Sequence, residues 1–101
     1  MDKMIPKSFK IFAHEFKVKY SDNLIQREGA VGIYRHSRNE ITVQNNIDGS
    51  NIMKTRQEQV YFHELVHCVF DQIGEDELCN NEKLVDVFSQ ALHQALKTSK
   101  Y

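Results

Sequence analysis

Hydrophobic and polar residues alternate in the first half of the chain. Between residues 7 and 20, two runs place large apolar side chains at alternate positions with lysines between them, at Phe9, Ile11, Phe16, Val18 and Tyr20. A two-residue repeat of this composition is typical of β-strands that bury one face. The pattern therefore predicts a hairpin that turns near Ala13 and His14, with His14 in the turn.

A second hairpin is expected after a short helical turn. The sequence Ser-Asp-Asn at 21–23 can cap a helical turn over 24–28, which Gly29 would end. Residues 30–35 and 40–44 then alternate again between apolar and polar side chains.

Polar segments bound this second hairpin. The sequence His-Ser-Arg-Asn at 36–39 would join its strands, and the polar run 45–51 has the composition of turns. The first half of the chain therefore predicts a small antiparallel sheet of three to four strands.

The hydrophobic repeat changes to a helical one in the second half. From residue 52 to residue 73, apolar side chains recur near helical spacing, at Ile52, Val60, Leu65, Val66, Val69, Phe70 and Ile73. Gly74 can end this helix, and the acidic residues 75–77 would form a short connector.

A second helix is predicted over about 82–97, with Asn80 or Asn81 as its N-cap. The apolar residues of this helix are expected to be buried, namely Leu84, Val87, Phe88, Ala91, Leu92, Ala95 and Leu96. A sheet followed by two packed helices predicts an α+β domain. The chain of 101 residues fits one domain over 1–101, with strands and turns to residue 50.

Composition narrows the possible partners. The formal net charge is −1, with 13 basic and 14 acidic residues mixed along the chain, so neither nucleic acid nor an anionic membrane surface is an expected partner. The chain has no apolar run of about 20 residues and no apolar segment of a secretory signal, which predicts a cytoplasmic protein. Cys68 and Cys79 form no Cys-x-x-Cys pair and are expected to be small buried residues.

His63 and His67 are the strongest candidates for chemistry. They belong to the sequence His-Glu-Leu-Val-His inside the predicted helix 52–73, and residues four apart lie one above the other on a helix. Both imidazoles can then reach one metal ion, with Glu64 beside them as a base. A catalytic zinc site has three protein ligands and leaves the fourth position to water, so a third ligand is expected.

Glu82 is the best candidate for that ligand, because it starts the second helix and Asp86 follows one turn later on the same face. Asp71 is a rival, four residues after His67. Three ligands stacked on one straight helix would span about 12 Å, however, which is too far for bonds near 2 Å. His93 lies about 16 Å along its helix from Glu82 and could only line the cleft.

The sequence HELVH at 63–67 followed by NEKLVD at 81–86 resembles the gluzincin group of zinc metallopeptidases, whose pattern is HExxH on one helix and N-E-x-x-x-D on the next. This resemblance implies that Glu82 completes the zinc shell and that Asp86 hydrogen-bonds His63. The short connection between the two helices makes the chain similar to very small, single-domain proteins of this kind, such as those of phage and mobile elements.

The resemblance implies hydrolysis of a polypeptide substrate with one Zn²⁺ per chain and Glu64 as general base. The oxyanion needs a further donor, for which the candidates are Tyr34, His36, His93 and Tyr101. By similarity to zincins, the strand at 40–44 would be an edge strand that receives an extended peptide. The alternative is a non-catalytic zinc-binding module of the same shape that binds a protein partner.

Overall fold

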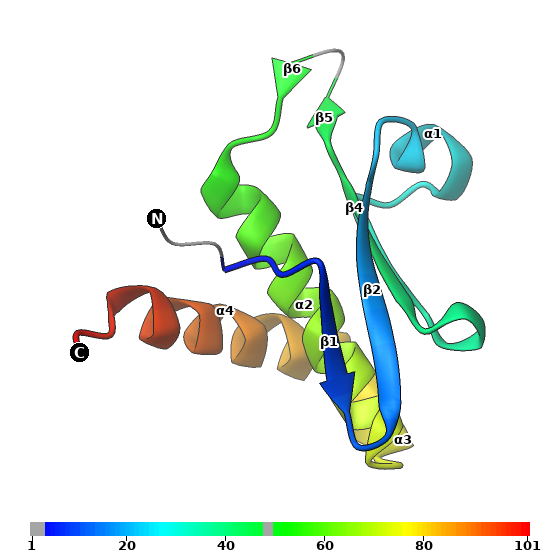
Figure 1. Cartoon of the computed structure of the whole chain (residues 1–101), viewed down its shortest axis with the longest axis vertical. Coiled ribbons are helices and arrows are strands. Elements are labelled where there is room, and N and C mark those ends of the chain that lie inside the picture. The colour runs from blue at the N-terminus through cyan, green and yellow to red at the C-terminus, as the bar shows by residue number, and fades with distance from the viewer. Residues whose placement is uncertain (1–3, 48–49) are drawn as a thin grey trace.

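In the computed structural model, residues 4–47 and 50–101 are described, and they form a small α+β fold. A four-stranded sheet packs against a long helix, α2 (Lys54–Gln72), and a second long helix, α4 (Glu82–Thr98), crosses α2 (Figure 1). The four-residue helix α3 (Asp76–Cys79) joins α2 to α4. The predicted fold class is confirmed.

The sheet contains β1 (Ser8–Ile11), β2 (His14–Ser21), β4 (Glu40–Gln44) and β3 (Gly32–Arg35), in this spatial order. β1 with β2 and β3 with β4 form the two predicted antiparallel hairpins, whereas β2 and β4 run parallel. The sheet is therefore mixed rather than antiparallel. Parallel strands need a crossover connection, and here the chain passes through helix α1 (Leu24–Glu28) and β3 before β4 begins.

The first turn lies slightly earlier than predicted. Ile11 pairs with His14, so the turn consists of Phe12 and Ala13, and His14 starts β2 instead of lying in the turn. Phe12 adopts a φ of 56°, which reverses the chain direction. The tip of the second hairpin is a short 3₁₀ turn, His36–Arg38, at the predicted place.

Side chains from one face of the sheet form the core with α2. The buried residues of this core come from the N-terminal segment, β2, β4 and α2, and are Ile5, Phe16, Ile41, Val43, Tyr61, Phe62 and Cys68. The ring of Phe9 on β1 stacks on Phe16 with a centroid distance of 5.3 Å. Strand β4, which carries two of these core residues, pairs with β2 on one side and β3 on the other and therefore lies inside the sheet rather than at an edge.

The chain leaves β4 through two short paired strands, β5 (Asn46–Ile47) and β6 (Ser50–Asn51). Residues 48–49 of the predicted polar turn lie outside the described residues. The buried amide of Gln44 accepts a hydrogen bond from the backbone N–H of Ile25 at 3.0 Å, which attaches α1 to the end of β4.

The helices begin and end close to the predicted positions. Gly74, with a φ of 79°, follows the end of α2, as the sequence indicated. The acidic connector 75–77 leads into α3 and is partly helical, rather than an irregular link. Of the two N-cap candidates, Asn81 caps α4, because its side-chain oxygen accepts a hydrogen bond from the backbone N–H of Leu84 at 3.0 Å.

The prediction of which face of α4 is buried is wrong. Leu92 is half-buried, but the other apolar residues expected in the core are exposed: Leu84, Val87, Phe88, Ala91, Ala95 and Leu96. The buried residues of α4 are Val85, Ser89 and His93 instead. This buried side of the helix faces α2, and the same side places Glu82 next to the histidines of α2.

In the part of the chain that the structure describes, the helices are too short or too polar to cross a membrane.

Candidate metal centre

Helix α2 holds the two histidines of the HExxH sequence next to each other. Phe62 and Val66 are buried and fix the rotation of the helix, while His63 and His67 are half-buried on an adjacent face. The two imidazole rings lie with their centroids 5.0 Å apart. The i, i+4 spacing therefore brings the rings together, as predicted.

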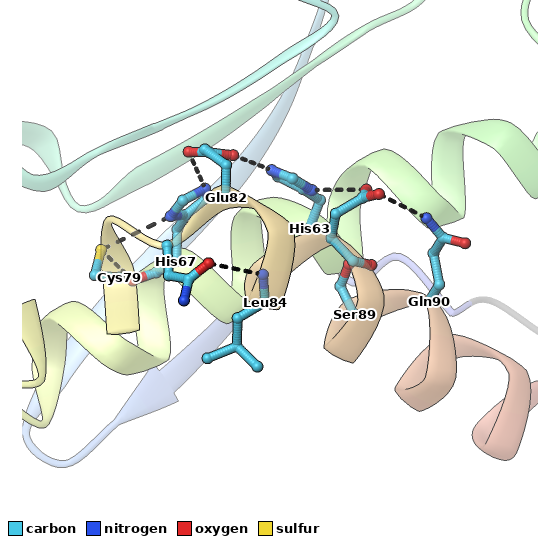
Figure 2. Close-up of polar contacts among 9 residues, drawn as sticks. His63, His67, Cys79, Glu82, Leu84, Ser89 and Gln90 are labelled. Carbon is cyan, nitrogen blue, oxygen red and sulfur yellow. Dashed lines mark hydrogen bonds and ion pairs between the residues drawn. The ribbon is translucent and has the colours of Figure 1, made fainter. Parts of the chain in front are cut away.

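Glu82 reaches both histidines from the start of α4. Its Oε1 lies 3.2 Å from Nε2 of His63, and its Oε2 lies 3.1 Å from Nε2 of His67 (Figure 2). The Asn81 cap fixes where α4 begins, so Glu82 is the first residue of the helix and points back across α2. The structure thus brings together the three residues that the sequence proposed as metal ligands.

The donor set fits a metal ion. One ligand atom from each of His63, His67 and Glu82 can be chosen so that all lie within 4.8 Å of one another. Ligand atoms about 2.1 Å from a tetrahedral ion are separated by roughly 3.4 Å. The observed distances from the carboxylate to the two imidazoles are close to that value, so this group can hold a metal ion.

The second nitrogen of His63 also has a partner. Nδ1 of His63 lies 3.5 Å from Oδ1 of Asp86, and Asp86 in turn accepts a hydrogen bond from the amide of Gln90 at 3.0 Å. A carboxylate beside the outer nitrogen of a ligating histidine fixes the orientation of the ring and makes it a better donor to the metal. Asp86 therefore lies where the resemblance placed it.

Cys79 is a site residue that the sequence analysis missed. Its Sγ donates a hydrogen bond to the backbone carbonyl of His67 at 3.4 Å and lies 3.7 Å from Nδ1 of the same residue. Cys68 is fully buried as predicted, but Cys79 is only half-buried and holds His67 as Asp86 holds His63. The sequence position of Cys79 could have indicated this role, because Cys79 lies on the short segment that connects His67 to Glu82.

Glu64 lies between α2 and strand β3. A Cβ atom on Gly32 would come within 3.3 Å of Cγ of Glu64, so the strand passes directly over this side chain. Burial raises the pKa of the Glu64 carboxyl to about 7, although the nearby His67 and a hydrogen bond from the backbone N–H of Tyr34 lower it. A carboxyl group with this pKa can both accept and return a proton near neutral pH.

Two adjoining hollows open beside these residues. One has a volume of about 530 Å³ and extends from His63 toward Arg56 and Gln90, and the other, of about 440 Å³, contains His67 and Glu82. Gly32, His63 and Glu64 line both hollows. They form one cleft along β3, with the candidate metal ligands and the candidate base near its middle.

The strand beside the cleft is β3, not the predicted strand 40–44. In the sheet order β4 lies between β2 and β3, so β4 is an inner strand and β3 is at the edge. The backbone N–H of Gln44 donates to the carbonyl of Val31 at 2.8 Å. Because an antiparallel ladder alternates, the backbone groups of Gly32 and Tyr34 then point away from β4 and toward the open edge.

The four candidates for an oxyanion donor lie in different places. Tyr34 lines the cleft, but its hydroxyl donates to Oδ2 of Asp71 at 2.6 Å, and burial together with this bond raises its pKa. The exposed His36 also binds Asp71, with 2.6 Å between Nδ1 and Oδ2. His93 is buried against Glu58, and Tyr101 is fully exposed at the C-terminal end.

Asp71 was a rival for the third ligand, and the structure places it elsewhere. Its carboxylate accepts the hydroxyl of Tyr34 and faces His36. Burial raises the pKa of Asp71, but the bonds from Tyr34 and His36 outweigh it and lower the pKa below the ordinary value. Asp71 therefore anchors the second hairpin to α2, while Glu82 occupies the ligand position.

No family model, curated protein or solved structure matches this chain.

Proposed function

We propose that the protein is a zinc-dependent metallopeptidase that cleaves a polypeptide bound along strand β3. The observation that supports this proposal is the convergence of His63, His67 and Glu82 beside Glu64 in an open cleft bordered by an edge strand. Two imidazoles and one carboxylate form a typical ligand set for catalytic zinc, and three protein ligands leave a position open. A structural zinc would require a fourth protein ligand to close its shell.

Different residues would bind the metal and transfer the proton. When bound by His63, His67 and Glu82, zinc would polarise the peptide carbonyl and acidify a water molecule. Glu64 takes a proton from the attacking water and returns it to the leaving nitrogen. The backbone N–H of Tyr34 holds the Glu64 carboxylate in the cleft, so that the proton acceptor is already in place before the substrate arrives.

Strand β3 supplies the binding surface for an extended polypeptide. The outward N–H of Gly32 and the outward carbonyl groups of Gly32 and Tyr34 can pair with a substrate strand, which is how exposed sheet edges bind peptides, while the N–H of Tyr34 donates to Glu64. Such pairing would lay the peptide over Glu64 and beside His63, since these residues and Gly32 line the same cleft. Tyr34 is then the best placed of the four oxyanion candidates, because it lines the cleft, whereas His36, His93 and Tyr101 line neither hollow.

Incubation of the zinc-loaded protein with unfolded polypeptides tests this proposal. Glu64→Gln should retain zinc and the fold but lose hydrolysis by at least about 100-fold, because general bases contribute that much. Glu15→Gln is the matched control, because Glu15 is an exposed carboxylate on β2, away from the cleft. This variant should hydrolyse the polypeptides at the same rate as the parent. Product formation is followed by mass spectrometry, which also identifies the bond that is cut.

Two results would reject the proposal. Equal hydrolysis by Glu64→Gln and the parent would show that Glu64 is not the base. Zinc binding without any hydrolysis by the parent, across a broad set of unfolded polypeptides, would favour the alternative of a zinc-binding module that binds a protein partner without cutting it.

A further inference from the structure

Helix α4 presents apolar side chains to solvent. Val87 is 60 % exposed and Phe88 is 47 % exposed, although both are large and apolar. Phe70 and Ile73 at the end of α2 extend this surface, and the ring of Phe70 lies on that of Phe88 with centroids 6.1 Å apart. We call this surface the α4 face; it consists of Phe70, Ile73, Leu84, Val87, Phe88, Ala91 and Ala95. Contiguous exposed apolar surfaces of this kind mark interaction sites.

The α4 face lies on the opposite side of the helix from the candidate metal centre. Ala91 follows Glu82 by nine residues, which corresponds to about two and a half turns and hence to the opposite side of the helix. Val85, Ser89 and His93 pack inward on the same side of the helix as Glu82. A partner on the α4 face would therefore leave the cleft open.

The spacing of the α4 face fits another helix. Leu84, Phe88, Ala91 and Ala95 follow one another at intervals of four, three and four residues, which is the repeat by which two helices pack along a seam. The large side chains lie in the first half of this stripe and the small ones in the second half. If two copies pair in antiparallel orientation about Ala91, Val87 of each faces Ala95 of the other, so a large residue meets a small one.

The charges at the two ends of α4 favour the same arrangement. Glu75, Asp76 and Glu77 are exposed beside its beginning, whereas Lys100 is exposed near its end. Antiparallel pairing brings the acidic end of one copy next to the basic end of the other and also aligns the helix dipoles favourably. Parallel pairing would bring like charges together.

We propose that the α4 face binds a second copy of this chain, giving a two-fold symmetric dimer with antiparallel α4 helices and two outward-facing clefts. A two-fold interface must be complementary to itself, and the α4 face is complementary to itself both in side-chain size and in charge. The inference does not depend on the proposed peptidase activity.

Sedimentation of the full chain from low micromolar to millimolar concentration tests the dimer. The parent should form dimers, and Val87→Glu and Ala91→Glu should each weaken association by at least about 100-fold, because each buries an unpaired charge. Met53→Glu is the matched control: Met53 is 73 % exposed but lies at the start of α2, outside the α4 face, so this variant should dimerise like the parent. Circular dichroism and zinc content confirm that each variant is folded.

Oxidative cross-linking tests the orientation. Ala91→Cys should form a disulfide between copies, because residue 91 of one copy lies next to residue 91 of the other at the two-fold axis. Ala95→Cys should give no more cross-linked dimer than the parent, in which Cys68 and Cys79 set the background level. A parent that stays monomeric at millimolar concentration, a dimer that both glutamate variants leave intact, or faster cross-linking through position 95 than through position 91 would each overturn the proposal.

Discussion

Gly32 determines how closely β3 approaches α2. A Cβ atom at this position would collide with Cγ1 of Val60 and would press on the Glu64 side chain, whose Cγ and Oε2 would be 3.3 and 3.4 Å away. The absence of a side chain at Gly32 is therefore what allows the edge strand to lie over the candidate base. One residue connects the packing of the sheet to the geometry of the cleft.

We expect Gly32→Ala to destabilise the fold by about 1–3 kcal/mol, as overpacked sites usually do, and to lower hydrolysis because Glu64 is displaced. Chemical denaturation and peptide hydrolysis measure the two effects. The double variant Gly32→Ala/Val60→Ala should recover part of both losses, since it removes the methyl group that the new Cβ would meet. If Gly32→Ala behaves like the parent, then β3 does not need this close approach.

The candidate ligands could be predicted from sequence because helix geometry fixes them locally. His63 and His67 are four residues apart on one helix, and Glu82 follows an asparagine that caps the next. The positions of Cys79 and Tyr34 could not be predicted. Cys79 reaches His67 only because the acidic connector folds into α3, and Tyr34 reaches Glu64 and Asp71 only through the register of β3 on β4.

At the scale of elements, the strands and helices followed from hydrophobic periodicity, but the rotation of α4 did not. Its most apolar side faces solvent, while Ser89 and His93 face α2. The sequence could not show this, because the inward His93 finds its partner on another helix, and the Ser89 hydroxyl donates to the carbonyl of Asp86 in its own helix. His93 Nε2 lies 2.9 Å from Oε1 of Glu58, and the ammonium of Lys97 donates to the same oxygen at 2.6 Å.

This contact makes the packing of α2 on α4 dependent on pH. Glu58 is 2 % exposed and His93 is 5 % exposed. Burial raises the pKa of the Glu58 carboxyl, but the hydrogen bonds from Lys97 and His93 outweigh it, so the pKa lies below 4.5. A carboxyl group whose pKa is lower in the folded state stabilises the fold above its unfolded pKa, and this contribution is lost as the pH falls through the folded value.

We therefore expect Glu58→Gln to lower the free energy of unfolding of the metal-free protein at pH 7 by about 3 kcal/mol, because it breaks a buried charged pair. The difference from the parent should shrink as the pH falls below about 4. Urea denaturation over a pH series measures this, with Glu15→Gln as the control for loss of an exposed carboxylate. A difference between parent and Glu58→Gln that stays constant down to pH 2 would contradict the assignment.

At the scale of the whole molecule, the candidate metal centre joins parts of the chain that are otherwise linked by one short helix. His63 and His67 belong to α2, Glu82 belongs to α4, and α3 lies between them. A metal ion that binds this group must bind the folded state far better than the unfolded one, because only folding brings the two helices together. Metal binding and folding are therefore coupled.

We expect one zinc per chain by elemental analysis and a rise in the thermal midpoint when zinc is added. At a free zinc concentration about 100 times the dissociation constant, binding to one site adds about 2.7 kcal/mol to the free energy of unfolding. His63→Ala and His67→Ala should fold in the absence of metal but show little of this rise, whereas Glu64→Gln should show all of it, because Glu64 is assigned to proton transfer and not to the metal. Full stabilisation of both alanine variants by zinc would place the metal elsewhere on the chain, and loss of stabilisation in Glu64→Gln would make Glu64 a ligand instead of the base.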